Sequence, residues 1–180
     1  MTRWSRAAAF VAALLLAACA SVAPPEETPS GETLSGRLVV NVAATPGAGA
    51  RSLNAAFELQ GDARVGRLNL STPLGSMLAQ ARWSPGHVVL KTPQGERQFA
   101  DLDGLTREVL GESLPLAALF DWLRGRPWPG APSTATKPPA ASGFEQLGWK
   151  VDLARFDQAA VAATRVQAPA VTVRAKLEQP

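Results

Sequence analysis

The sequence predicts a mainly β fold with helices, of the α+β class, in which one antiparallel sheet carries helices on one side. Two observations lead to this prediction. Short segments of alternating apolar and polar residues recur between turns, about eight to twelve residues apart, as in an antiparallel meander. Apolar residues at helical spacing interrupt this pattern once, between residues 101 and 125, and strand patterns then resume. This order of strands, helices and strands favours a single layered unit.

The first predicted strands follow a flexible beginning and are separated by turn residues. Leu38, Val40 and Val42 alternate with their neighbours, and the turn at residues 60–62 separates the next two strands. Pro85-Gly86 and the turn at residues 93–95 then divide the remainder of the meander. The predicted strands here are residues 37–42, 53–60, 65–70, 77–84, 87–91 and 97–99.

Two helices are predicted next, followed by a loop and further strands. Either Asp101 or Asp103 can cap the first helix, which carries apolar residues at helical spacing and ends at Gly111. Leu114-Pro115 begins the second helix, which Gly125 closes. Residues 126–143 contain five prolines and are expected to form a loop without its own core. Strand patterns return at residues 144–147, 148–153 and 170–174, whereas residues 155–167 are weakly patterned.

The turn Thr72-Pro73-Leu74-Gly75 has proline second and glycine fourth, which is typical of a type I turn. It places Leu74 at the tip of a hairpin. From the residues alone, packing of Leu74 on a neighbouring element is favoured over a role at a membrane.

The N-terminus has the pattern of an export signal. Arg3 and Arg6 precede a twelve-residue apolar stretch, residues 7–18, which is too short to span a bilayer core of about 30 Å. The stretch ends in Leu16-Ala17-Ala18-Cys19, which resembles the bacterial lipobox. We therefore expect removal of residues 1–18 and lipidation of Cys19, the only cysteine.

Cleavage changes the charge balance. The whole chain has 180 residues with 18 Lys and Arg against 15 Asp and Glu, and cleavage leaves 162 residues with 16 against 15. This near-neutral balance does not support nucleic-acid binding. Residues 19–33 are expected to form a lipidated, flexible tether rich in proline and polar residues, and residues 34–180 a single domain.

The residue inventory does not favour an enzyme. His87, the only histidine, is expected to be an exposed strand residue, and Asp101 and Asp103 are better explained by helix capping than by acid–base chemistry. The sequence contains no nucleophile elbow, phosphate-binding loop or metal-ligand spacing. No cofactor and no metal are expected.

An ordered series of short motifs resembles the LolB family of outer-membrane lipoprotein receptors. The series covers nearly the whole mature chain and departs from the family at residues 131–141 and 155–167. Its members are Ser35-Gly36-Arg37, Thr72-Pro73-Leu74-Gly75, Pro85-Gly86-His87-Val88, Ala100-Asp101, Leu114-Pro115-Leu116, the segment Phe120–Pro127 and Gly148-Trp149-Lys150-Val151.

The resemblance implies an unclosed antiparallel half-barrel with helices covering a concave hydrophobic face. It also implies a lipid-anchored monomer on the periplasmic side of the outer membrane, and the absence of Asp beside Cys19 fits that location. The cavity would accept acylated lipoproteins from the periplasmic carrier LolA and deliver them to the inner leaflet. Leu74, held by Pro73 and Gly75, would then insert into the membrane.

Sequence alternation cannot separate a cavity wall from a filled core, so both interpretations stay open for the apolar positions, including the two tryptophans that match the family. The candidates are Leu38, Val40, Leu68, Leu70, Met77, Ala79, Ala81, Trp83, Leu105, Val109, Leu119, Trp122, Leu123 and Trp149. Two other classes remain as alternatives. One is a structural or assembly lipoprotein that binds a protein partner through its sheet edge, and the other is a lipid-anchored hydrolase.

Overall fold

A computed structural model describes residues 29–178. In this part of the chain eleven strands form one antiparallel sheet, with two α-helices between the sixth and seventh strands. The strands are β1 Thr33–Val42, β2 Arg51–Gly61, β3 Gly66–Ser71, β4 Met77–Ser84, β5 His87–Thr92, β6 Gly95–Phe99, β7 Ser133–Ala135, β8 Gly143–Gln146, β9 Trp149–Asp152, β10 Ala160–Arg165 and β11 Val171–Leu177. The helices are α2 Leu102–Leu110, α3 Leu116–Leu123 and the short 3₁₀ helix η1 Phe156–Gln158.

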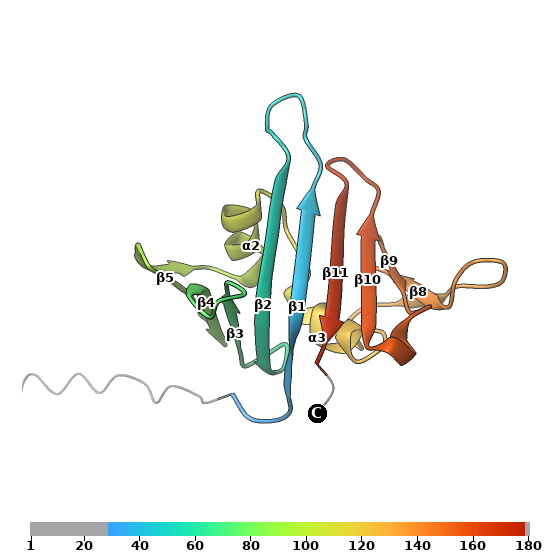
Figure 1. The fold of residues 1–180 in the computed structure, drawn as a ribbon, viewed down its shortest axis with the longest axis horizontal. Helices are drawn as coiled ribbons and strands as arrows, with labels where there is room; N and C mark the ends of the chain where they lie inside the picture. The colour runs from blue at the N-terminus through green and yellow to red at the C-terminus, as the bar shows by residue number, and fades with distance from the viewer. Residues whose placement is uncertain (1–28, 179–180) are drawn as a thin grey trace, which may run out of the picture.

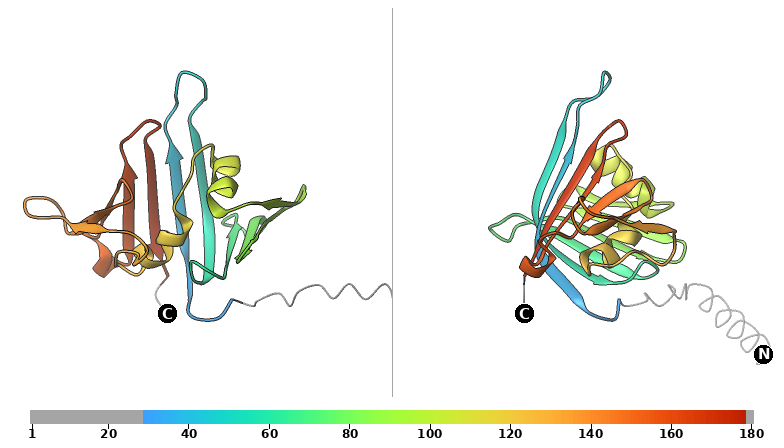
Figure 2. Two further views of the ribbon diagram at one scale, coloured as in Figure 1. Left: turned by 180° about the vertical axis from the view of Figure 1, so that it is seen from behind. Right: turned by 90° about the vertical axis from the view of Figure 1, so that its right-hand side faces the viewer.

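The sheet is strongly curved and does not close. Its strand order is β6-β5-β4-β3-β2-β1-β11-β10-β9-β8-β7, so the two ends of the described chain meet in the middle, where β1 pairs with β11. Helices α2 and α3 lie on the concave side (Figures 1 and 2). The predicted fold class, mainly β with helices in an unclosed antiparallel sheet, is therefore confirmed.

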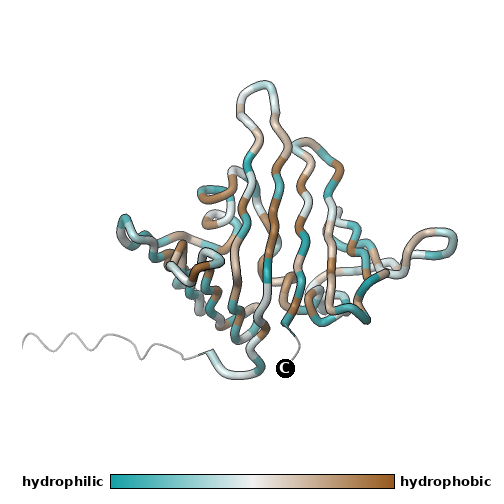
Figure 3. The backbone as a smooth tube through the Cα atoms, in the orientation of Figure 1, coloured by the Kyte–Doolittle hydropathy of each residue, from teal (hydrophilic) through white to brown (hydrophobic). Residues whose placement is uncertain are grey.

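Side-chain alternation gives the sheet its two faces. Leu38 and Val40 of β1 are buried between the exposed Arg37 and the half-buried Val39, and their partners on β11 alternate in the same register. This period of two puts one set of side chains under the helices and the other on the outside of the sheet. The alternation of apolar and polar positions is visible along the central strands (Figure 3).

Helix α2 begins and ends at the residues that local chemistry favours. The carboxylate of Asp101 accepts a hydrogen bond from the backbone N–H of Gly104 at 2.6 Å, so Asp101 rather than Asp103 is the N-cap. At the other end Gly111 adopts φ 79° and donates to the carbonyl of Arg107. This left-handed conformation suits glycine, and it turns the chain towards α3.

Two strands were not expected from the sequence. Strand β10 lies in part of the weakly patterned region. Its sequence does not predict a strand, because three of its six residues are alanines and give little contrast between the two faces. Strand β7 lies within residues 126–143, expected to be loop, and pairs with β8 although all three of its residues are exposed. Pairing with an existing sheet edge explains a strand that has no apolar pattern of its own.

Candidate functional site

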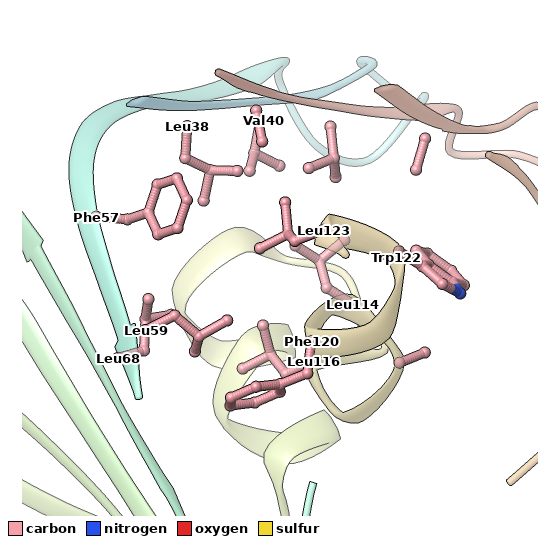
Figure 4. Close-up of a cluster of buried hydrophobic side chains, with 14 of the residues drawn as sticks. Leu38, Val40, Phe57, Leu59, Leu68, Leu114, Leu116, Phe120, Trp122 and Leu123 are labelled. Atoms are coloured by element: carbon pink, nitrogen blue, oxygen red, sulfur yellow. The ribbon is translucent and has the colours of Figure 1, made fainter. Parts of the chain in front are cut away.

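An apolar cavity of about 50 Å³ lies between the concave face of the sheet and the two α-helices. The close-up in Figure 4 shows Leu38 and Val40 pointing from the sheet towards Leu114 and Leu123 of the helical segment. The cavity is lined by Leu38, Val40, Leu53, Leu68, Leu70, Ala79, Ala81, Leu90, Leu105, Thr106, Val109, Leu110, Leu114, Leu116, Leu119 and Val173. All but one of these residues are aliphatic.

The single polar residue of the cavity wall is satisfied within the protein. The hydroxyl of Thr106 accepts a hydrogen bond from the backbone N–H of Leu114 at 3.0 Å and donates to the carbonyl of Asp103 at 3.2 Å. These bonds also connect α2 to the start of α3. Because no polar group of the wall is left without a partner, the wall cannot form hydrogen bonds with water or a polar ligand. Its surface is complementary to a hydrocarbon chain.

Nine of the sequence candidates come together in the cavity wall. They are Leu38, Val40, Leu68, Leu70, Ala79, Ala81, Leu105, Val109 and Leu119. Val109 is 40% exposed although it lines the cavity, so the cavity wall reaches solvent at helix α2.

The other candidates lie elsewhere. Met77 is 43% exposed at the start of β4 and does not line the cavity. Trp83 packs edge-on against Phe120, with 5.6 Å between the ring centroids. Leu123, Trp122 and Trp149 are buried in the packed core beside the cavity. Leu123 and the three tryptophans therefore belong to the filled core, and Met77 lies beside the register shift between β3 and β4.

Seven further wall residues were missed as site positions, although their elements were anticipated. They are Leu53, Leu90, Thr106, Leu110, Leu114, Leu116 and Val173. Leu90 and Val88 are buried on the same face of β5, on either side of the half-buried Val89. Leu116 is a buried residue of α3. The signal in the sequence was the same period that identified the others, but the period does not say which inward positions have space in front of them.

The loop between β3 and β4 projects away from the molecule. The backbone N–H of Gly75 donates to the carbonyl of Thr72 at 2.9 Å, and Gly75 has φ 86°. The Thr72 hydroxyl also accepts from the N–H of Ser76 at 3.1 Å. These bonds fix a tight turn whose tip, Leu74, is 95% exposed. In the right-hand view of Figure 2 the loop lies on the side of the sheet opposite to the helices.

The described residues hold few groups for chemistry. Within residues 29–178 no cluster of three His, Cys, Asp or Glu residues could bind a metal ion. His87 is exposed at the first position of β5. None of the described helices is long and apolar enough to cross a bilayer. Cys19 and the rest of the expected export signal lie outside the described residues.

Fold and cavity together define a class: an open β half-barrel whose helices cover an apolar cavity. Comparison with known proteins identifies the family. Residues 33–179 match the family described as "Outer membrane lipoprotein LolB". The chain therefore belongs to the LolB family of outer membrane lipoproteins.

Individual relatives agree with this assignment. The outer-membrane lipoprotein LolB of Bordetella petrii is 36% identical over 149 residues, which cover 79% of this chain and 74% of the relative. Those of Cupriavidus pinatubonensis and Cupriavidus necator are 35% identical over 167 residues and 33% identical over 175 residues. These alignments cover 88% and 92% of this chain, and 78% and 88% of the two relatives.

Proposed function

We propose that this outer-membrane lipoprotein is a receptor that accepts the acyl chains of other lipoproteins in its cavity and releases them into the inner leaflet of the outer membrane. The donor in this proposal is the soluble periplasmic carrier LolA, and no catalytic step is involved. The observation that carries the proposal is the apolar cavity, whose wall holds one polar residue, itself satisfied.

Energetics explain why a receptor is needed. Exposing a chain of about sixteen carbons to water costs roughly 13 kcal/mol at about 0.8 kcal/mol per methylene. A lipoprotein with three chains faces about three times that cost, so free passage through the periplasm is excluded. Transfer from one apolar cavity to another avoids the exposure, and a rising order of affinities gives it direction without ATP.

The cavity must widen to hold its cargo. A volume of about 50 Å³ is far below the roughly 300–1,000 Å³ of pockets that enclose small-molecule ligands. Helices α2 and α3 supply six of the sixteen wall residues and are joined to the sheet by loops at residues 100–101 and 124–132. We propose that α2 moves away from the sheet as acyl chains enter, whereas α3 stays bonded to β8 through Trp122 and Gln146. Aliphatic contacts would replace one another during this movement.

We assign the release of the acyl chains into the membrane to the β3–β4 loop that carries Leu74. A fully apolar side chain that is 95% exposed at the tip of a tight turn contributes nothing to the core. Insertion of this side chain into a bilayer would bury its surface and hold the receptor against the membrane. Lipidation of Cys19, after removal of residues 1–18, would keep the receptor at the same surface through residues 19–33.

The cavity is tested with a matched pair of substitutions in β3. Leu70→Glu places a carboxylate in the cavity wall, whereas Asn69→Glu places one on the outer face of the same strand. The measurement is transfer of an acylated lipoprotein from the carrier to the purified receptor. We expect Leu70→Glu to reduce transfer at least tenfold and Asn69→Glu to leave it near normal. Equal transfer by both variants, with both folded by circular dichroism, would exclude the cavity as the binding site.

The loop is tested separately with Leu74→Glu. Val166 provides the control, because it is also an apolar loop residue and is 83% exposed. In cells that depend on the variant receptor, Leu74→Glu is expected to leave lipoproteins in the soluble periplasmic fraction, and Val166→Glu to sort them normally. Normal sorting with Leu74→Glu would contradict the role of the loop.

The main alternative is a structural or assembly lipoprotein that binds a protein partner. The edges of the sheet are β6 and the three-residue β7, and a partner strand could pair with either. The apolar cavity favours the receptor function over this alternative, because a protein that binds its partner through a sheet edge would not need a cavity. Failure of acyl uptake together with a tight complex at a sheet edge would reverse this preference.

A further inference from the structure

A second concavity lies on the outer face of the sheet, behind the apolar cavity. It has a volume of about 410 Å³ and crosses β1, β11 and β10 to reach the segment before η1. We call it the outer groove and define it by four cationic residues of its wall: Arg37, Arg155, Arg174 and Lys176. Three of these lie on the strand face opposite to the buried Leu38, so the groove and the cavity do not share side chains at these positions.

The groove has a strong excess of positive charge. Asp152 is the one carboxylate in its wall, and its Oδ1 already accepts a hydrogen bond from the backbone N–H of Ala154 at 2.8 Å. The ion pairs found between described residues involve none of the four cations. Lys176 donates only to the backbone carbonyl of Gln158. The wall thus presents three guanidinium groups and an ammonium group with little internal compensation.

The register of the sheet makes this arrangement unfavourable without a ligand. Arg37 on β1 is directly opposite Lys176 on β11, and Arg174 follows two residues away on the same face. Like charges directly opposite each other destabilise an antiparallel pair. Carboxylates occur nearby, but Glu178 accepts from the hydroxyl of Ser35, and Glu58 faces Arg67 at 3.9 Å. A bound anion between the cations would remove the repulsion.

Small residues on the third strand leave room for such an anion. Ala160 is opposite Lys176, and Ala162 is opposite Arg174, so β10 adds no bulk between the cationic side chains. Guanidinium groups donate in a planar fork that matches phosphate oxygens. The groove therefore has the charge, donors and space to hold the phosphate of a lipid headgroup.

Two features point to a membrane as the source of that phosphate. The β3–β4 loop with Leu74 projects from the same side of the sheet that carries the groove (Figure 2). Thirteen residues lie between Cys19 and Thr33 at the start of β1, and this segment reaches only about 50 Å when fully extended. Arg37 is four residues further along β1. A lipid anchor at Cys19 would therefore keep the start of β1, close to Arg37, within about 50 Å of the bilayer.

We propose that the outer groove binds the phosphate groups of anionic phospholipids and so orients the receptor with its convex face, and Leu74, against the membrane. This inference rests on the proposed function, because it concerns the membrane at which that function ends. Cations in contact with an anionic surface each strengthen binding about fivefold, and this attraction weakens as salt rises.

The test is vesicle binding by the mature chain with Cys19→Ser, a change that removes the anchor and leaves every described residue in place. Co-sedimentation is measured with vesicles of phosphatidylcholine alone and of phosphatidylcholine mixed with phosphatidylglycerol, at low and high salt. The groove variant combines Arg37→Gln, Arg174→Gln and Lys176→Gln. The control combines Arg107→Gln, Arg126→Gln and Lys137→Gln, which remove the same charge from residues outside the groove.

The unsubstituted protein is expected to prefer the phosphatidylglycerol vesicles and to lose that preference at high salt. The groove variant should bind those vesicles on the order of 100-fold more weakly at low salt, and the control less than about fivefold more weakly. The groove variant should unfold at the same temperature as the parent or higher, since it removes opposed like charges.

Three results would overturn the inference: no preference for anionic vesicles, equal losses in the groove variant and the control, or normal vesicle binding by a groove variant that no longer accepts cargo from the carrier. The last result would assign the groove to a protein partner. Failure of the proposed function is a different outcome, because Leu74→Glu would then sort lipoproteins normally whatever the groove variant does.

Discussion

The two halves of the sheet bury apolar side chains in different ways. Most of the cavity wall comes from strands β1 to β5 and helix α2, which supply leucine, valine, alanine and the hydrogen-bonded Thr106. Strands β8 and β9 with the end of α3 enclose a solid core, in which Trp122 lies 6.0 Å from Trp149 and 6.5 Å from Phe144 between ring centroids. One half therefore has a cavity beneath its helices, and the other is filled by packed aromatic rings.

Hydrogen bonding sharpens the contrast. The buried side chain of Gln146 accepts from the indole N–H of Trp122 at 2.8 Å and from the backbone N–H of Trp128 at 2.9 Å. It also donates to the carbonyls of Trp128 and Ala131, both at 2.7 Å. These directional bonds fix α3, the following loop and β8 in one arrangement. Apart from the two hydrogen bonds of Thr106, the contacts in the cavity wall are aliphatic and interchangeable. The comparison indicates that a rigidly packed half can support a half that deforms.

The largest effect is expected from Trp122→Ala in the solid half. It would open a hole beside Phe144 and Trp149 and leave Gln146 without one partner, so the free energy of unfolding should fall by about 3–5 kcal/mol. Chemical denaturation followed by circular dichroism measures this loss. Trp122→Phe, which keeps an aromatic ring but removes the indole N–H, is the control and should cost less. A loss below about 1 kcal/mol for Trp122→Ala would mean that this half is not rigidly packed.

Replacing one alanine in each half by leucine should change the stability of the fold in opposite directions. Ala163 is 3% exposed in the C-terminal half of the sheet, and Ala163→Leu should cost about 1–3 kcal/mol by overpacking. Ala79 lines the cavity, so Ala79→Leu should be neutral or stabilise by up to about 1 kcal/mol, while lowering acyl uptake. Thermal unfolding and lipid uptake check the pair. Equal destabilisation by both substitutions would show that the cavity side has no more space than the core.

The smallest change in stability is expected at Asp62, in the turn between β2 and β3. Backbone N–H groups of Val65 and Arg64 donate to the Asp62 carboxylate and lower its pKa. Because this pKa is lower in the folded state, the charged carboxylate stabilises the fold at pH values above the unfolded-state pKa of about 3.9. This stabilisation is lost as the pH falls through the folded-state pKa. Asp62→Asn should thus be less stable than the parent at pH 7 and equally stable once Asp62 is protonated. A stability difference that does not change with pH would contradict this role.

The sequence predicted the elements better than it predicted their roles. Leu38 and Trp83 both occupy inward positions of predicted strands, but only Leu38 has space in front of it. Alternation reports which face a side chain takes, whereas a cavity depends on volumes contributed by strands and helices far apart in the chain. Strand β10 was missed because alanine on both faces conceals the period, and the exposure of Leu74 could not be decided from the turn alone.

The outer face illustrates the same limit. Arg37 and Lys176 are separated by almost the whole domain in sequence, and only the pairing of β1 with β11 places them opposite each other. Their charges were counted in a near-neutral total, which does not reveal a local excess. Net charge describes the whole molecule, whereas binding depends on how charge is distributed over one face.

The central claim, that the cavity holds acyl chains, is tested most directly by photochemical labelling of the unsubstituted protein. A triacylated lipoprotein with a photoreactive diazirine in its acyl chains is transferred from the carrier and irradiated, and the adducts are mapped by mass spectrometry. We predict adducts on peptides that contain Leu70, Val109 and Leu119, which line the cavity. Adducts confined to β8 and β9, or to the outer face at Val39, would contradict the account.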